Sequence, residues 1–167
     1  MIEELTAATE AGSIRAARQL LLEYGRFVAA QPGTARFSFA SLEREADRLP
    51  MSFAEQGGGS LLALVGGEPA GFVAWRAIAQ NELVVAGSWE MKRLWVRPAS
   101  RGLGMGRLLT QAVLDRAVVA RQRAVYLDTA PEAMATAYRL YVEMGFMPCG
   151  RYNDNPVDGL AYMVKFF

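Results

Sequence analysis

The chain has 167 residues, of which 52% are hydrophobic and 21% are charged, and its formal net charge is +1. This length fits one domain, and the composition excludes a chain that is disordered over most of its length. A net charge so close to zero gives no strong attraction to nucleic acid or anionic membranes, so we expect neither as a partner. There is no histidine and one cysteine, Cys149. These counts exclude Ser-His-Asp and Cys-His nucleophiles, histidine-ligated metals and an intrachain disulfide, and we expect no metal site.

No targeting or membrane-spanning segment is visible in the sequence. The N-terminus carries Glu3, Glu4 and Glu10 and has no basic stretch, so it does not resemble a signal peptide. The longest apolar stretches, such as Leu61–Gly67, are far shorter than the ~20 residues that a spanning helix needs. We therefore expect a cytoplasmic protein.

The first half of the chain predicts two helices followed by three strands. Apolar residues recur at helical spacing between Ile14 and Gly25, which indicates a first amphipathic helix. Ser41–Leu49 predicts a second, shorter helix with Ser41 as its N-cap and Pro50 closing it. The predicted strands are Leu61–Val65, Pro69–Ala77 and Glu82–Val96, with Gly66-Gly67 as a tight turn between the first two.

The second half predicts a helix, a strand, a second helix and two final strands. Gly104 is expected to open the first of these helices, and Gly145 to end the second. Thr129 and Glu132 have the spacing of a capping box, so we expect the second helix to open there. The predicted strands are Ala124–Asp128, Phe146–Tyr152 and Leu160–Phe166. This order predicts a mixed α/β domain around one sheet, partly covered by the N-terminal helices.

Three glycines alternate at positions 102, 104 and 106, between the strand that ends at Val96 and the next helix. Such a loop turns sharply and lets a phosphate approach the backbone, and the helix start presents unpaired N–H groups to it. The spacing is neither that of the dinucleotide fingerprint nor that of a Walker A loop. On glycine spacing alone, a turn that only caps the helix is an equal alternative. Arg101 and Arg107 favour diphosphate binding, because both side chains can reach the ligand.

A second motif lies downstream, where Ala137-Tyr138-Arg139-Leu140-Tyr141 is followed by Gly145-Phe146. It is similar to the signature Ala-x-x-Leu-Tyr-x-x-x-Gly-Phe of the GCN5-related N-acetyltransferases (GNAT). The segment Arg101-Gly102-x-Gly104-x-Gly106 resembles motif A of the same family. The order and separation of the two motifs also match, and the resemblance is strongest over Glu90–Phe146. It implies a single N-acetyltransferase domain over residues 1–167, with a mostly antiparallel sheet that is splayed at the acetyl-CoA site and flanked by about four helices.

The resemblance also implies where acetyl-CoA would bind. The backbone N–H groups of the glycine loop would hold the pyrophosphate, and the preceding strand would pair with the pantetheine arm. This pairing is chemically reasonable because pantetheine carries two amides that can bond to an exposed strand edge. The expected cofactor-binding residues are Leu94, Trp95, Val96, Arg101, Gly102, Leu103, Gly104, Met105, Gly106 and Arg107.

Acetyl transfer to an amine requires a proton acceptor, because an amine with a pKa near ~10 is protonated at neutral pH. Glu90 is the first candidate, since it lies six residues before Val96, where some members of the family have their general base. Counted at the two-residue period of a strand, every second residue from Glu90 to Val96 shares one face. The alternative for Glu90 is an ion pair with a basic neighbour such as Lys92. Asp128, at the end of the next strand, is the second candidate, and the sequence leaves both open.

Tyr141 is the candidate acid. The resemblance implies that its phenol lies beside the CoA sulfur, where it can stabilise or protonate the departing thiolate. A phenol is a suitable donor because it remains protonated at neutral pH. Without the resemblance, we would interpret Tyr141 as a core aromatic in a helical stripe with Met134, Ala137 and Tyr138.

The acceptor pocket is the part of the site that the sequence describes least. Aromatic residues and polar residues near the last hairpin are candidates, and ordinary packing or surface position also explains each of them. Arg151 is the candidate for a substrate carboxylate, on the fork geometry of its guanidinium alone. The candidates are Phe37, Phe39, Phe53, Trp75, Arg151, Tyr152 and Asn155.

We therefore predict an N-acetyltransferase that moves the acetyl group of acetyl-CoA directly to a primary amine of a small molecule, an amino acid, polyamine or similar. The reaction would be a base-assisted attack through a tetrahedral intermediate. The alternatives are a CoA-binding regulatory module without turnover, an acetyltransferase for protein N-termini or lysines, and a structural interaction domain. The family accepts many amines, so the fold does not choose the acceptor. A homodimer is compatible with the resemblance, because dimers are common among such enzymes.

Overall fold

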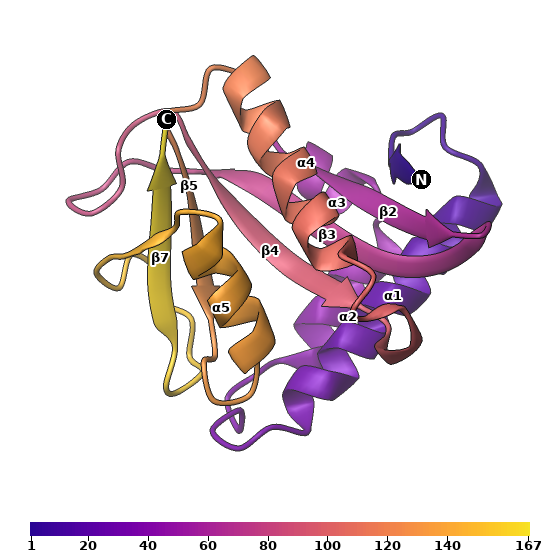
Figure 1. The fold of residues 1–167 in the computed structure, drawn as a ribbon, viewed down its shortest axis with the longest axis horizontal. Coiled ribbons are helices and arrows are strands. Elements are labelled where there is room, and N and C mark those ends of the chain that lie inside the picture. The colour runs from indigo at the N-terminus through magenta and orange to yellow at the C-terminus, as the bar shows by residue number, and fades with distance from the viewer.

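A seven-stranded sheet in the order β1-β2-β3-β4-β5-β7-β6 runs through the computed structural model, which describes residues 1–167 (Figure 1). Neighbouring strands are antiparallel except β4 and β5, which are parallel. The mixed, mostly antiparallel α/β fold that the sequence predicts is confirmed. The strands are β1 (Ile2–Glu4), β2 (Gly59–Val65), β3 (Glu68–Ile78), β4 (Ser88–Val96), β5 (Ala124–Thr129), β6 (Met147–Pro148) and β7 (Ala161–Phe166).

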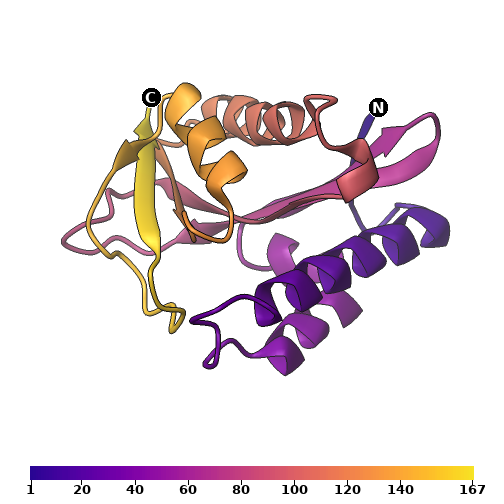
Figure 2. The ribbon, with the colours of Figure 1, turned by 60° about the horizontal axis from the view of Figure 1, so that its bottom comes forward.

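The helices form two layers, one on each face of the sheet (Figure 2). The first three pack on one face around a core that includes Leu20, Leu42 and Phe72. The last two pack on the other face around a core that includes Leu109, Val113 and Leu127. None of them has the length and apolar content that crossing a bilayer requires. They are α1 (Ala11–Ala29), α2 (Phe39–Asp47), α3 (Met51–Ala54), α4 (Met105–Val119) and α5 (Ala135–Glu143), with a 3₁₀ turn, η1 (Pro98–Ser100), before α4.

Two predicted helix starts are wrong, and each has a local reason. Ser38, not Ser41, caps α2, because the Ser38 hydroxyl accepts a hydrogen bond from the Ser41 N–H at 3.2 Å. Thr129 stays in β5, paired with Ala161 of β7, so the predicted capping box does not form and α5 begins after Met134. Two predicted strands are shorter in the structure. The strand predicted over Glu82–Val96 begins only at Ser88, because residues 79–87 form a loop, and the strand predicted over Phe146–Tyr152 is reduced to β6. The elements β1 and α3 were not predicted.

β4 contains a bulge at Arg93, whose φ is +62°. Lys92 lies opposite Ala74 and Trp95 opposite Phe72, so β4 has one residue more than β3 across this interval. The extra residue reverses the alternation of side chains along the strand. Trp95 packs in the core under α1 and α2, whereas Leu94 packs in the core under α4 and α5. The prediction that every second residue from 90 to 96 shares one face is therefore wrong.

β4 and β5 separate soon after they meet. They are paired only where Ser88, Trp89 and Glu90 lie opposite residues 124–126. Beyond Glu90, β4 remains paired with β3, and β5 remains paired with β7 as far as Thr129. The sheet is thus split between the ends of β4 and β5, and the split leaves the edge of β4 unpaired on that side.

Candidate active site

Two adjoining cavities open at the split between β4 and β5. The loop cleft, of about 710 Å³, lies between the end of β4, the glycine loop and α5. The inner pocket, of about 400 Å³, lies between the first two helices, the sheet and the loop before β7. Leu94, Ala133 and Met134 line both cavities, so the two meet at the end of β4.

The glycine loop gives the loop cleft an anion-binding backbone. Gly102 and Gly104 have φ values of +79° and +75°, and no atom lies within 4 Å of where a Cβ would be added at either position. The backbone N–H groups of residues 102–107 donate no hydrogen bond within the protein. They gather at the N-terminus of α4, where the helix dipole also favours negative charge. This arrangement fits a phosphate or diphosphate.

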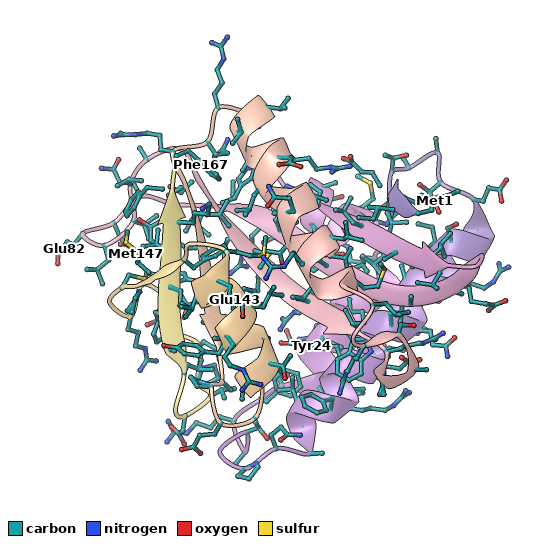
Figure 3. All side chains as sticks on the ribbon, viewed as in Figure 1. Met1, Tyr24, Glu82, Glu143, Met147 and Phe167 are labelled. Carbon is teal, nitrogen blue, oxygen red and sulfur yellow. The ribbon has the colours of Figure 1, made fainter.

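Two arginines flank this backbone. The Nε of Arg101 donates to the carbonyl of Val96 at 3.1 Å, and its guanidinium lies 5.1 Å from the ring centroid of Trp95. Arg107 forms an ion pair with Glu143, which lies on the side of α5 that faces α4 (Figure 3). The residues expected to bind the cofactor all line the loop cleft except Leu103, whose side chain points to solvent and is 57% exposed.

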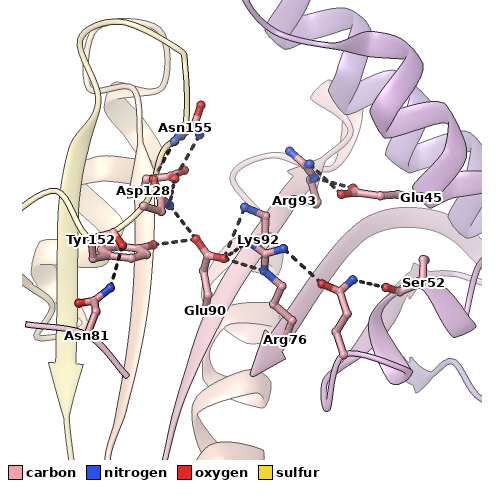
Figure 4. A network of polar contacts seen from close by, with 12 residues as sticks. Glu45, Ser52, Arg76, Asn81, Glu90, Lys92, Arg93, Asp128, Tyr152 and Asn155 are labelled. Atoms are coloured by element: carbon pink, nitrogen blue, oxygen red, sulfur yellow. Dashed lines mark hydrogen bonds and ion pairs between the residues drawn. The ribbon is translucent and has the colours of Figure 1, made fainter. Parts of the chain in front are cut away.

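Glu90 lies buried beside the inner pocket and does not line it. Its carboxylate accepts hydrogen bonds from Arg76 at 2.8 Å, Tyr152 at 3.0 Å and Asn153 at 2.9 Å, and the Lys92 Nζ lies 3.6 Å away (Figure 4). Burial on its own would raise the pKa of Glu90. The charges of Lys92 and Arg76 and the hydrogen bonds outweigh burial and hold that pKa below its ordinary value. Glu90 is therefore an ionised carboxylate with both oxygens engaged.

Asp128, at the end of β5, lines the inner pocket directly. Its Oδ2 accepts hydrogen bonds from the amide nitrogens of Asn153 at 2.7 Å and Asn155 at 3.1 Å, whereas its Oδ1 accepts none. The Asn153 amide thus contacts both Glu90 and Asp128 and brings the two candidate bases into one network (Figure 4). Asp128 has an acceptor oxygen available to a ligand, and Glu90 has none.

Tyr141 projects from α5 into the wall of the inner pocket and is 5% exposed. Its ring packs edge-on against Phe146, with the two centroids 5.7 Å apart, and its hydroxyl makes no hydrogen bond within the protein. Burial raises the pKa of Tyr141 well above its ordinary value, so the phenol is protonated at neutral pH. The structure thus brings Tyr141 and Asp128 to one pocket.

Among the residues expected in the acceptor pocket, Phe37 and Asn155 line the inner pocket. Phe53 and Trp75 are instead buried in the two main cores, and Phe39 packs between α1 and α2. Tyr152 serves Glu90 rather than a ligand. Arg151 does not line the inner pocket, and its guanidinium donates to the main-chain carbonyls of residues 153 and 155 at 3.1 and 3.2 Å.

Sequence reasoning missed several residues of the inner pocket. Arg93 forms a two-point ion pair with Glu45 of α2, at 2.9 and 3.1 Å, and lies over the ring of Tyr24. The loop after α1 and the loop before β7 also meet, because the Asp158 N–H donates to the Gly33 carbonyl at 3.2 Å. This contact closes one side of the inner pocket. The only local signal was the run of polar residues at 153–155, which contains two of the amide donors.

Comparison with known proteins places these features in context. The family model described as the Acetyltransferase (GNAT) family matches residues 18–146. A curated protein of Schizosaccharomyces pombe, described as an uncharacterized N-acetyltransferase, is 39% identical over 77 residues. This match covers 46% of the present chain and 47% of that protein, about half of its length.

Solved structures show the same fold at low sequence identity. An acetyltransferase from Streptococcus agalactiae is similar with a TM-score of 0.74 and 18% identity, covering 100% of this chain and 98% of the other. An N-acetyltransferase from Thermoplasma acidophilum, solved in complex with coenzyme A, is similar with a TM-score of 0.66 and 15% identity. That likeness covers 100% of this chain and 99% of the other.

Replacing Glu90 tests the buried network. Glu90→Gln leaves the charges of Arg76 and Lys92 facing a neutral amide, so we expect the free energy of unfolding at pH 7 to fall by about 3 kcal/mol. The stability that the lowered pKa of Glu90 contributes is present above the ordinary carboxyl value of 4.5 and is lost as the pH falls below it. The measurement is denaturant unfolding of both proteins at pH 7 and at about pH 3, where the difference should shrink.

The matched control is Glu55→Gln, which removes a half-exposed carboxylate paired with Arg48. We expect it to change the free energy of unfolding by less than about 1 kcal/mol. Equal effects of the two substitutions, or a Glu90 effect that does not change with pH, would contradict this account of the network.

Proposed function

Since this chain belongs to the GNAT family of acetyltransferases, we propose that it transfers the acetyl group of acetyl-CoA to a primary amine of a small molecule. The proposal treats residues 1–167 as one catalytic domain. The observation that carries it is that a cleft with an anion-binding backbone adjoins a pocket containing an available carboxylate, Asp128. The cytoplasmic location and the homodimer expected from the sequence stay predictions.

The loop cleft fits acetyl-CoA. The unpaired N–H groups of residues 102–107 would bind the pyrophosphate, with Arg101 and Arg107 beside it. The unpaired edge of β4 at Leu94, Trp95 and Val96 would bond to the pantetheine amides in the manner of an added strand. Bound acetyl-CoA supplies a thioester carbonyl for an amine to attack and a thiolate as the leaving group.

We assign the proton acceptor to Asp128 and a positioning role to Glu90. A general base must lie within hydrogen-bond reach of the proton that it removes, and Asp128 lines the pocket with one oxygen available. Glu90 does not line the inner pocket, and both of its carboxylate oxygens already accept hydrogen bonds from protein side chains. Through Asn153, Glu90 holds the amide that bonds to Asp128, and in this way it orients the base.

Tyr141 is the proposed donor to the departing thiolate. It lines the inner pocket, which meets the loop cleft at Leu94, Ala133 and Met134. Its hydroxyl has no hydrogen-bond partner within the protein, so its proton is available to the sulfur of a bound thioester. The high pKa of the buried phenol keeps this proton in place at neutral pH.

The inner pocket favours a small acceptor over a protein. Its volume of about 400 Å³ lies near the lower end of the range of about 300–1,000 Å³ for small-molecule sites. The contact between Asp158 and Gly33 closes the side on which an extended polypeptide would otherwise lie. The available carboxylate of Asp128 favours turnover over a purely regulatory role.

Substitution of Gly104 tests the cofactor site. Gly104→Val places a branched side chain where the phosphates must approach, so we expect acetyl-CoA affinity to fall by more than about tenfold. Gly66→Val is the matched control, because Gly66 also has a positive φ, +59°, and open surroundings, but lies in the turn between β2 and β3. Calorimetry on both folded variants gives the answer. Unchanged affinity in folded Gly104→Val would exclude the loop as the cofactor site.

The choice of base is tested by pH–rate profiles. Asp128→Asn removes the proton acceptor, so kcat/KM should fall by about 10²–10⁴-fold at neutral pH. The loss should shrink at higher pH, because free amine then forms without help. Glu90→Gln should lower the rate without removing the acidic limb of the profile. If instead Glu90→Gln removes that limb and Asp128→Asn retains it, Glu90 is the base.

A further inference from the structure

Lys92 lines the inner pocket with a mostly buried side chain, and its ammonium makes no hydrogen bond within the protein. Its side chain is 13% exposed, and its nearest acidic atom is the Glu90 Oε2 at 3.6 Å, which is beyond hydrogen-bond distance. The ammonium has three N–H donors that no protein atom accepts, and it is not fully enclosed, so a ligand in the inner pocket can reach it. Burial lowers the pKa of Lys92, and the attraction of Glu90 opposes this shift without cancelling it.

The other buried charges around this pocket are already paired. Arg76 pairs with Glu90 through Nε and Nη2, both 2.8 Å from Oε2, and the Lys92 Nζ lies 3.6 Å from the same oxygen, so one carboxylate faces two cations. Arg93 is neutralised by Glu45. Lys92 and Asp128 lie on the two strands that border the split, β4 and β5, and both line the pocket (Figure 4). The lining also contains the charges of Arg36, Asp154 and Asp158, which belong to exposed residues.

We propose that Lys92 binds a carboxylate of the acceptor, and that the acceptor is therefore an amino acid or a similar short amine with one carboxylate. This inference rests on the proposed function. An amine directed to Asp128 and a carboxylate directed to Lys92 match the separated charges of the pocket. A polyamine or aminoglycoside would bring several positive charges toward Lys92 and no negative one. A phosphate, with about −1.5 to −2 charges, would exceed the charge of Lys92 and would be repelled by Asp128.

This assignment replaces the sequence-based expectation for Arg151. That side chain is exposed, and its guanidinium is bound to the main-chain carbonyls of its own loop. Lys92 instead projects from β4 just before the bulge, on the face of the sheet that the inner pocket uses. A carboxylate bound there would supply the hydrogen bonds that the ammonium lacks.

The test compares acceptors that differ only in their carboxylate. Alanine, leucine, methionine and phenylalanine are each assayed as the free amino acid, the α-carboxamide and the decarboxylated amine, by release of CoA from acetyl-CoA. A charge-assisted hydrogen bond predicts that the acid is preferred over its carboxamide by about 10- to 100-fold in kcat/KM. Lys92→Met should bring this ratio close to one, mainly because the KM for the free amino acid rises. Lys92→Arg should keep the preference.

Lys165→Met is the matched control, because Lys165 is the other lysine of the chain and donates to the Met144 carbonyl at 2.9 Å, outside the pocket lining. It should keep the wild-type preference. Turnover of the amines without preference for the acids, or a preference that survives in Lys92→Met, overturns the role of Lys92 and leaves the proposed function standing.

Absence of turnover with every compound would contradict the proposed function instead. Calorimetry of N-acetylleucine binding in the presence of CoA then decides the role of Lys92. Binding at least about tenfold tighter to the wild type than to Lys92→Met supports the inference, and equal binding overturns it.

Discussion

The bulge at Arg93 is the constraint on which both cavities depend. A non-glycine residue with a φ of +62° is unfavourable inside a strand, and here the two-point ion pair between Arg93 and Glu45 of α2 holds it. Because of the extra residue, Lys92 faces the inner pocket while Leu94 lines the junction with the loop cleft. The split between β4 and β5 begins just before the bulge, after Glu90, and leaves the edge of β4 available to a ligand.

Two carboxylates in one network acquire different roles from their surroundings. Glu90 is buried against Arg76 and Lys92 and accepts hydrogen bonds at both oxygens, so it holds the network together as an anion at neutral pH. Asp128 shares the Asn153 amide with it but keeps one oxygen available in the pocket. Acid–base sites typically contain neighbouring carboxyl groups whose different surroundings give them different roles. The network also fixes the loop before β7, so the wall of the pocket and its proposed base are positioned together.

The sequence predicted the parts of the site that local patterns encode. The alternating glycines and the run ending at Tyr141 are short motifs that can be recognised from consecutive residues. The glycine loop precedes α4, as expected. The face of β4 was mispredicted because a bulge has no signature in a two-residue period. Contacts such as Glu45 with Arg93 or Asn153 with Asp128 join residues 48 and 25 positions apart, so no local pattern reveals them. Arg151 differs from these, because its guanidinium donates to main-chain carbonyls only two and four residues further along its own loop.

The central claim is that the split sheet brings a thioester bound in the loop cleft to the wall of the inner pocket. A crystal structure of the protein with CoA measures this directly. We predict that the pyrophosphate lies on the N–H groups of residues 102–107, that the pantetheine arm follows the edge of β4, and that the sulfur is within hydrogen-bond reach of the Tyr141 hydroxyl. CoA bound outside the loop cleft, or bound there with its sulfur turned away from Tyr141 and the inner pocket, would contradict the account.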